Sequence, residues 1–189
     1  MELYEAIETR RTIRIFTAGV TEAQLRKLLA VGAKAPSTRN KQSWEFIWVT
    51  EPQLVDQIAE LKYQYNRKFP PGPGESQQEV EERALNQQRW FAHATVVAVC
   101  TQGGDVASAW LAVENISLAA VADGLGSGII GMGGVEKKAV ETLLGLPPVT
   151  NWSVSSSWGC PRGQPRNRPS GPSSAGCTRT HSNTSRPRP

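Results

Sequence analysis

The sequence is poor in the side chains that most often carry out chemistry or bind metals by themselves. Its 189 residues include three cysteines and two histidines. No two cysteines are spaced as CxxC, and two of the three lie in the last 41 residues. This pattern supports neither a disulfide framework nor a zinc site, and it fits a reducing compartment. His93, just before an apolar run, and Cys100, at its end, are more typical of structural residues than of catalysts.

Long hydrophobic runs are also missing. Apolar runs such as residues 95–100 are much shorter than the roughly 20 residues that a transmembrane helix needs. The first residues, MELYEA, have neither the basic region nor the apolar region of a secretory signal. We therefore expect a cytoplasmic protein that has no membrane partner.

Acidic residues are absent from residues 149–189. All 17 acidic residues and 15 of the 21 basic residues come earlier, so residues 1–148 carry a net charge of −2 and the tail carries +6. The basic isoelectric point of about 9.1 thus comes from the tail. Six arginines with two tryptophans among them are a weak indication of nucleic-acid binding, which would be strongly salt-dependent and lost on truncation after Pro148. We expect no nucleic-acid partner.

Hydrophobic periodicity and capping residues predict a chain of alternating helices and strands. Thr21 and Ser76 each begin a capping box, and Gly124 and Gly145 are suited to left-handed helix ends. Helices are expected at 22–34, from 50, at 76–90, 105–123 and 135–144, and strands at 44–50 and 94–100. Because there are no internal repeats, this order predicts a single α/β or α+β sandwich.

The first motif with possible chemistry is RRTIR near the N-terminus. Its polar members are Arg10, Arg11, Thr12 and Arg14. Guanidinium groups bind phosphate oxygens in pairs, and a threonine adds a hydroxyl or backbone donor. The motif therefore suits a phosphate, although a solvated basic turn has the same composition.

The second motif is the polar segment APSTRNKQSW, which lies between an expected helix and an expected strand. Backbone and side-chain groups of Ser37 and Asn40 could hydrogen-bond the edge of a planar heterocycle, with Trp44 nearby as a packing group. A polar connecting loop is the alternative interpretation.

The third motif is GLGSGIIGMGG at residues 124–134. It contains a GxGxxG pattern, but a helix precedes it and no acidic residue follows Glu141. A dinucleotide-binding fold needs a preceding strand and such an acid, so we reject that interpretation. What remains is a stretch where bare backbone can lie flat against a ligand. Since no side-chain catalyst is evident, the chemistry points to a cofactor.

Taken together, RRTIRIF, APSTRNKQSWEF and AWLAVENISLAAVADGLGSG resemble, in order and spacing, the FMN-dependent nitroreductase family. The resemblance covers residues 2–147. It implies an α+β fold, an α/β/α sandwich with a mainly antiparallel central sheet, and an intertwined homodimer with FMN at each interface.

The resemblance also implies roles for the three motifs. Residues of the first would hold the FMN phosphate, the ribityl chain and part of the ring edge: Arg10, Arg11, Thr12 and Arg14. Residues of the second would lie against the isoalloxazine, usually from the other subunit: Pro36, Ser37 and Asn40. The backbone of the third would approach the flavin N5: Gly131, Met132 and Gly133. No side chain would be a catalyst and no metal would be needed, because the flavin N5 carries the chemistry.

The implied activity is an NAD(P)H oxidoreductase. NADH or NADPH would give hydride to the flavin and leave, and a nitroaromatic, a quinone or a similar electron-poor molecule would then take the electrons. Residues 63–90 are a candidate substrate lid, and a plain surface excursion is the other interpretation. The alternative functions are a non-catalytic FMN-binding protein and an inactive, truncated remnant.

The tail departs from the family pattern. Family members continue past LGLP with a buried strand and a Gly-x-Pro turn, which residues 148–189 lack. If the codons are read one base earlier, they give an obligatory Leu after Asn151. If the serines are encoded by TCN codons, apolar residues followed by a Gly-x-Pro turn also become available. We therefore expect a nitroreductase-like domain at 1–147 without its last strand, and a disordered, out-of-frame tail at 148–189. A natural disordered tail is the alternative, and resequencing the 3′ end of the gene in independent clones distinguishes the two.

Overall fold

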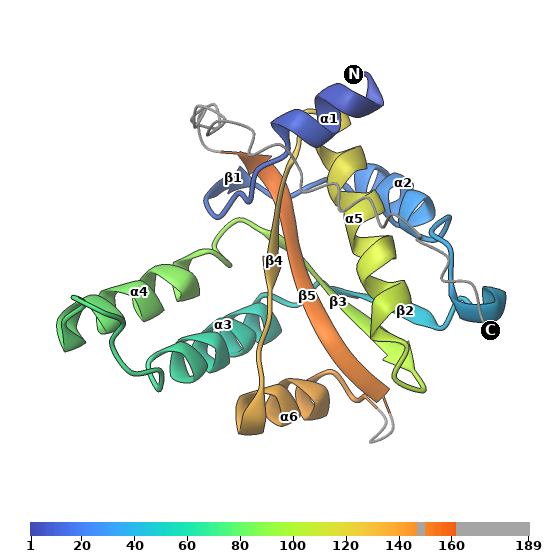
Figure 1. The fold of residues 1–189 in the computed structure, drawn as a ribbon. Helices are drawn as coiled ribbons and strands as arrows, with labels where there is room; N and C mark the ends of the chain where they lie inside the picture. The colour runs from blue at the N-terminus through green and yellow to red at the C-terminus, as the bar shows by residue number, and fades with distance from the viewer. Residues whose placement is uncertain (147–149, 162–189) are drawn as a thin grey trace, which may run out of the picture.

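A computed structural model of the protein describes residues 1–146 and 150–161. The elements follow one another in this order: α1 (Leu3–Thr9), β1 (Phe16–Ala18), α2 (Glu22–Gly32), the 3-10 helix η1 (Thr38–Asn40), β2 (Trp44–Val49), α3 (Pro52–Asn66), α4 (Gln77–Arg89), β3 (Thr95–Gln102), α5 (Val106–Ala122), β4 (Gly126–Ile130), α6 (Gly134–Leu143) and β5 (Thr150–Pro161). Figure 1 shows these elements wrapped around one twisted sheet.

The sheet has five strands, and each pair of neighbours is antiparallel. Its order is β1-β5-β3-β2, and β4 also pairs with β5. β5 therefore lies between β3 and β4, and β1 pairs with the last residues of β5 (Figure 1). The sequence prediction of a mainly antiparallel sheet is confirmed.

The core is organised by β3. Its residues 96–100 are all at most 1% exposed, because helices cover both faces of the strand. Side chains alternate along a strand, so Val97 and Val99 pack toward α2 and α5, whereas Val96, Ala98 and Cys100 pack toward α3 and α6. This gives three layers of helix, sheet and helix.

The expected helix ends are present. The side chain of Thr21 accepts a hydrogen bond from the backbone N–H of Gln24, and the Gln24 side chain accepts one in return from the backbone of Thr21. Ser76 and Glu79 form the same reciprocal pair at the start of α4. Gly124 has a φ of 74°, the left-handed conformation that ends α5. Both capping boxes predicted from the sequence are therefore confirmed.

β1 and β4 were not expected from the sequence. β4 contains Gly126 and Gly128, and glycine is normally depleted in strands. The reason for Gly126 is close packing, since a Cβ at this position would lie 2.8 Å from Cγ1 of Ile13. Residues 126–130 of the glycine-rich motif thus form a strand of the sheet, and the chain leaves the sheet at Gly131.

β5 contradicts one sequence prediction. The domain was expected to lack its last strand, yet residues 150–161 pair with three neighbouring strands. The physical reason is that ladder hydrogen bonds are made by the backbone, and the facing edges of β3 and β4 need partners whatever the side chains between them are. The expected disorder of the tail is likewise wrong for residues 150–161. Residues 147–149 and 162–189 lie outside the described residues, so disorder there and the shifted frame stay predictions.

Candidate functional site

The first motif lies against the start of β4. The backbone N–H of Ile13 donates to the carbonyl of Ser127 over 2.8 Å, and Thr12 forms a parallel bridge with Ser127. From there β4 runs to the glycine turn, which we define as residues 131–133. At about 3.3 Å per residue, the turn begins about 13 Å along the strand from the arginine motif. β4 thus has the arginine motif beside its first residues and the glycine turn, where backbone is not covered by side chains, after its last residue.

The three arginines of the motif have different partners. Nε of Arg10 lies 3.6 Å from a carboxylate oxygen of Glu114 on α5. Arg11 donates to backbone carbonyls at the end of α1. The guanidinium of Arg14 lies 4.8 Å from the ring centroid of Trp90, after α4. The three side chains belong to one short segment but do not share one partner.

The glycine turn is open on one side. A Cβ added to Gly131 would meet nothing within 4 Å among the residues that the structure describes, whereas one added to Gly133 would lie 3.3 Å from the hydroxyl of Tyr65. The turn therefore has a side that faces α3 and a side where another molecule can reach the backbone. Gly134, with a φ of 62°, then begins α6.

A buried lysine on α3 holds the closed side of this turn. Nζ of Lys62 donates to the carbonyl of Gly131 over 2.7 Å and to Oδ1 of Asn66 over 3.0 Å. Burial lowers the pKa of the Lys62 ammonium from 10.5 to about 8. The sequence interpretation did not find Lys62, although its place four residues after Ile58 on an amphipathic helix indicates an inward-facing position.

The second motif lies on the face of the sheet that α5 covers, whereas Met132 of the glycine turn packs on the face that α3 and α6 cover. The N–H of Thr38 donates to the hydroxyl of Ser108 on α5, and the N–H of Gln42 donates to the hydroxyl of Ser37. This loop leads into β2, which is three strands away from β4 in the order β4-β5-β3-β2, a lateral distance of about 14 Å. Within one chain, the structure does not bring Pro36, Ser37 and Asn40 next to the glycine turn.

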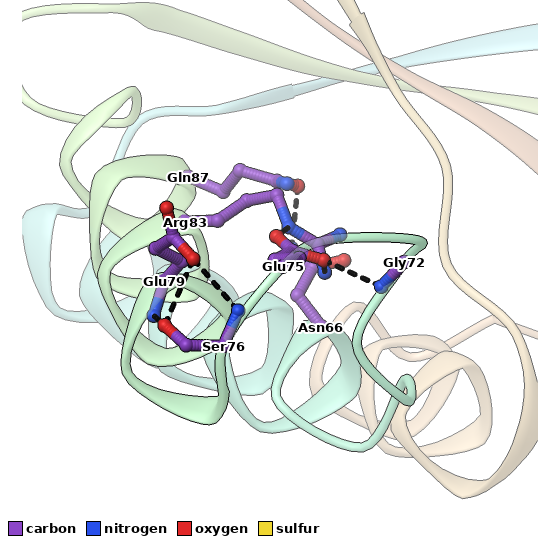
Figure 2. A network of polar contacts seen from close by, with 7 residues as sticks. All are labelled: Asn66, Gly72, Glu75, Ser76, Glu79, Arg83 and Gln87. Atoms are coloured by element: carbon purple, nitrogen blue, oxygen red, sulfur yellow. Dashed lines mark hydrogen bonds and ion pairs between the residues drawn. The ribbon is translucent and has the colours of Figure 1, made fainter.

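The candidate lid, residues 63–90, lies in a hairpin formed by α3 and α4, and polar contacts tie the loop that connects the two helices. Figure 2 shows Glu75 accepting hydrogen bonds from the backbone N–H of Gly72 and from Arg83. Nδ2 of Asn66 donates to Oε1 of Gln87 over 2.5 Å, which joins α3 to α4. The proline- and glycine-rich loop is thus held to the hairpin that carries it.

Metal and thiol chemistry find little support in the described part of the chain. Residues 1–146 and 150–161 contain no group of three or more His, Cys, Asp or Glu residues that could hold a metal ion. Cys100 is buried, and burial raises the pKa of its thiol to about 12. A thiol in this state is a poor nucleophile.

Within residues 1–146 and 150–161, no helix has the length and apolar character needed to cross a membrane.

Comparisons with known proteins agree with this arrangement. The chain matches the family model described as "Nitroreductase family" over residues 7–156. The chain belongs to the nitroreductase family. The family predicted from the sequence is therefore confirmed, and so is its α+β fold.

Individual relatives support the same assignment. This nitroreductase-family chain is 28% identical over 149 residues to a protein of Archaeoglobus fulgidus with the provisional name NADH dehydrogenase/NAD(P)H nitroreductase, a match that covers 77% of this chain and 78% of that protein. The crystal structure of iodotyrosine deiodinase bound to FMN and 3-iodo-L-tyrosine is similar, with a TM-score of 0.72, 25% identity and coverage of 88% of this chain and 95% of that one. A nitroreductase with bound FMN from Desulfitobacterium hafniense shares the fold, with a TM-score of 0.72, 20% identity and coverage of 87% and 92%.

Proposed function

We propose that this nitroreductase-family chain is an FMN-dependent oxidoreductase that uses NADH or NADPH to reduce nitroaromatics, quinones or similar electron-poor small molecules. The observation that carries the proposal is the arrangement along β4. The arginine motif lies at one end of the strand, and the open side of the glycine turn lies about 13 Å away at the other. FMN has the same polarity, with a phosphate at one end and a planar ring at the other.

The residues present fit this cofactor. The phosphate and the ribityl chain would be held by Arg10, Arg11, Thr12 and Arg14, and the ring would lie against the backbone of Gly131, Met132 and Gly133. When bound, FMN supplies the carrier that passes hydride in two steps from the nicotinamide to the acceptor. The chain's own part is to bind the two ends, orient the ring and cover it.

The present partners of the arginines do not oppose phosphate binding. The Arg10–Glu114 pair is long and half exposed, and such pairs contribute little to stability. The contact of Arg14 with the Trp90 ring leaves guanidinium N–H groups free to turn toward an anion. A phosphate offers both arginines shorter, bidentate bonds, so the exchange favours the cofactor.

A homodimer would complete the site. The second motif lies too far from the glycine turn of its own chain, so Pro36, Ser37 and Asn40 would reach a ring bound by the partner subunit. Large apolar side chains on α1 and α5 are between 43% and 80% exposed: Leu3, Tyr4, Ile7, Trp110 and Leu111. An apolar surface of this kind is typical of an interface, and a second copy of this chain is the partner that the incomplete site requires.

The test is to add FMN to the purified full-length chain, remove excess FMN, and add NADH or NADPH without oxygen. The proposal predicts a yellow protein that either nicotinamide bleaches, and recovery of the colour when a quinone or nitroaromatic is added. A protein that takes up no FMN contradicts the proposal. A yellow protein that neither nicotinamide bleaches supports the alternative, a non-catalytic FMN-binding protein.

Variants test the residues at the phosphate end. Replacing Arg10→Ala or Arg14→Ala should weaken FMN binding by about 10- to 100-fold, since each removes charge-assisted hydrogen bonds. Arg26→Ala is the matched control, because Arg26 is exposed on α2 and paired with Glu22 in its own helix. If Arg10→Ala and Arg14→Ala bind FMN as tightly as Arg26→Ala and the wild-type protein do, the assignment of these arginines to the phosphate is wrong.

A further inference from the structure

We infer that Lys62 is a positioning residue that aims the backbone N–H of Met132 at the flavin. The inference rests on the proposed function, because it concerns the way in which the glycine turn meets the ring. It adds a buried charge that belongs to none of the three sequence motifs.

The direction follows from the planar peptide bond. The peptide between Gly131 and Met132 is trans, so its C=O and its N–H point to opposite sides. The C=O is held by Nζ of Lys62 at 2.7 Å, on the side of α3. The N–H of Met132 is therefore directed away from α3. An acceptor atom on that side meets a donor that is already oriented, which removes the cost of ordering it during the reaction.

Lysine is well suited to this task. Lys62 as a residue is 6% exposed, so its ammonium needs partners that replace water. The structure provides the Gly131 carbonyl, the Asn66 amide oxygen and the face of the Tyr65 ring, whose centroid lies 5.1 Å from Nζ. A hydrogen bond from a charged donor is stronger than one between neutral groups. The lysine thus fixes the turn more firmly than a neutral side chain could.

The position of Lys62 is itself fixed by the hairpin. Asn66 accepts from Lys62 with its oxygen and donates with its nitrogen to Gln87 on α4. These two bonds determine which way the Asn66 amide is turned. Figure 2 shows the bond between Asn66 and Gln87. A chain of hydrogen bonds therefore leads from α4, through Asn66 and Lys62, to the glycine turn, and it connects the candidate lid to the place where the ring would lie.

Lys68 offers a matched control. It also joins the α3 region to α6, through a salt bridge with the buried carboxylate of Glu136, and this bridge holds the pKa of Glu136 below its usual range. Lys68 makes no contact with the carbonyl of Gly131 that the structure records. Lys68→Met therefore removes a lysine and an inter-helix contact near the turn but leaves the peptide after Gly131 anchored.

The first experiment uses the flavin-free protein and measures the backbone order parameters of residues 131–133 by NMR relaxation. Lys62→Met should lower them from the rigid range of about 0.85 to below about 0.6, because the bond that anchors the peptide after Gly131 is lost. Lys68→Met should leave them in the rigid range, and Lys62→Arg, which keeps a charged donor, should restore most of the order. Equal order parameters in the wild-type protein and Lys62→Met would overturn the inference.

The second experiment uses the FMN-loaded protein. Lys62→Met should keep its FMN affinity within about threefold, because the phosphate end lies at the other end of β4, and should lower the rate of flavin reduction by about tenfold. Asn66→Ala, which keeps the lysine but removes its orienting partner, should give an intermediate rate and serves as the second variant should Lys62→Met not fold. Reduction rates equal to wild type in both variants contradict the inference. If the wild-type chain binds no FMN, the proposed function fails, and the order parameters of the flavin-free protein still decide whether Lys62 holds the turn.

Discussion

The two faces of the sheet differ in the buried charged groups that they contain. On the α2 and α5 face, Leu28, Val97 and Ile116 have no exposed surface, and the buried hydroxyl of Ser117 donates to a carbonyl of its own helix. On the α3 and α6 face, an apolar core is accompanied by buried Lys62 and other polar groups whose bonds run between elements.

This difference indicates that one face of the sheet mainly stabilises the fold and the other mainly supports the proposed site. The apolar contacts of α2 and α5 with the sheet depend on the fit between side-chain shapes, so this face is suited to be a rigid scaffold. The proposed dimer surface lies on the outer side of α5. Polar contacts between α3, α4 and the glycine turn depend on protonation and on the orientation of single side chains. The second face is therefore the one on which changes affect function more than stability.

The largest effect is expected at the centre of the apolar face. Ile116→Ala removes a fully buried side chain that packs against α2 and β3, and it should lower the free energy of unfolding by about 2–5 kcal/mol. Urea denaturation measures this loss. Arg26→Ala, at the surface of the same layer, is the control and should change stability by less than about 0.5 kcal/mol. A loss under 1 kcal/mol for Ile116→Ala would show that this face is not a close-packed scaffold.

The next effect separates the two faces by pH. The pKa of Lys62 falls from 10.5 in the unfolded chain to about 8 in the folded one, so between these values the unfolded chain binds more protons. Stability therefore rises with pH across this window, by on the order of 2–3 kcal/mol. Urea denaturation from pH 7.5 to 10.5 should show this rise in the wild-type protein relative to Lys62→Met.

Other groups cancel in this comparison. The pKa of Tyr63 is raised, chiefly by its hydrogen bond to Glu81, but Tyr63 is present in both proteins. A difference between wild type and Lys62→Met that stays constant from pH 7.5 to 10.5 would contradict the buried position of the ammonium.

A third effect tests how tightly the apolar face is packed. A Cβ on Gly32 would lie 2.6 Å from two side-chain atoms of Ile116, so Gly32→Ala should cost about 1–3 kcal/mol through overpacking. In an Ile116→Ala background the neighbour is smaller, and the same change should cost clearly less. A double-mutant cycle measured by urea denaturation reports this coupling, and additive effects would contradict the contact.

The smallest effect compares equivalent caps on the two faces. Thr21→Ala at the start of α2 and Ser76→Ala at the start of α4 each remove a capping-box hydroxyl and should cost about 1 kcal/mol. Hydrogen exchange should separate them. Thr21→Ala lowers protection in the core helices α2 and α5, whereas Ser76→Ala lowers it in the hairpin and leaves α5 unchanged. The same exchange pattern in both variants would remove the distinction between the two layers.

Local patterns in the sequence were sufficient to predict much of the fold. The capping boxes at Thr21 and Ser76 and the left-handed glycine at residue 124 are decided by neighbouring residues, and all three are confirmed. β4 and β5 were not predicted, because their pairing depends on distant backbone edges rather than on their own strand propensity.

The same division applies to the site. The arginine motif and the glycine turn were found because their composition is unusual, and the structure places them at the two ends of β4. Lys62 was missed because a lysine in a helix normally points to water, and its partner at Gly131 lies 69 residues further along the chain. That Pro36, Ser37 and Asn40 act across a dimer stays a prediction.

A crystal structure of the full chain grown with FMN tests the central claim most directly. The account predicts a phosphate bound beside Arg10–Arg14, a ring against the backbone of Gly131–Gly133, and residues 36–40 of a second copy on the other side of the ring. FMN bound elsewhere on the chain, or with its phosphate at the glycine turn, would contradict the account.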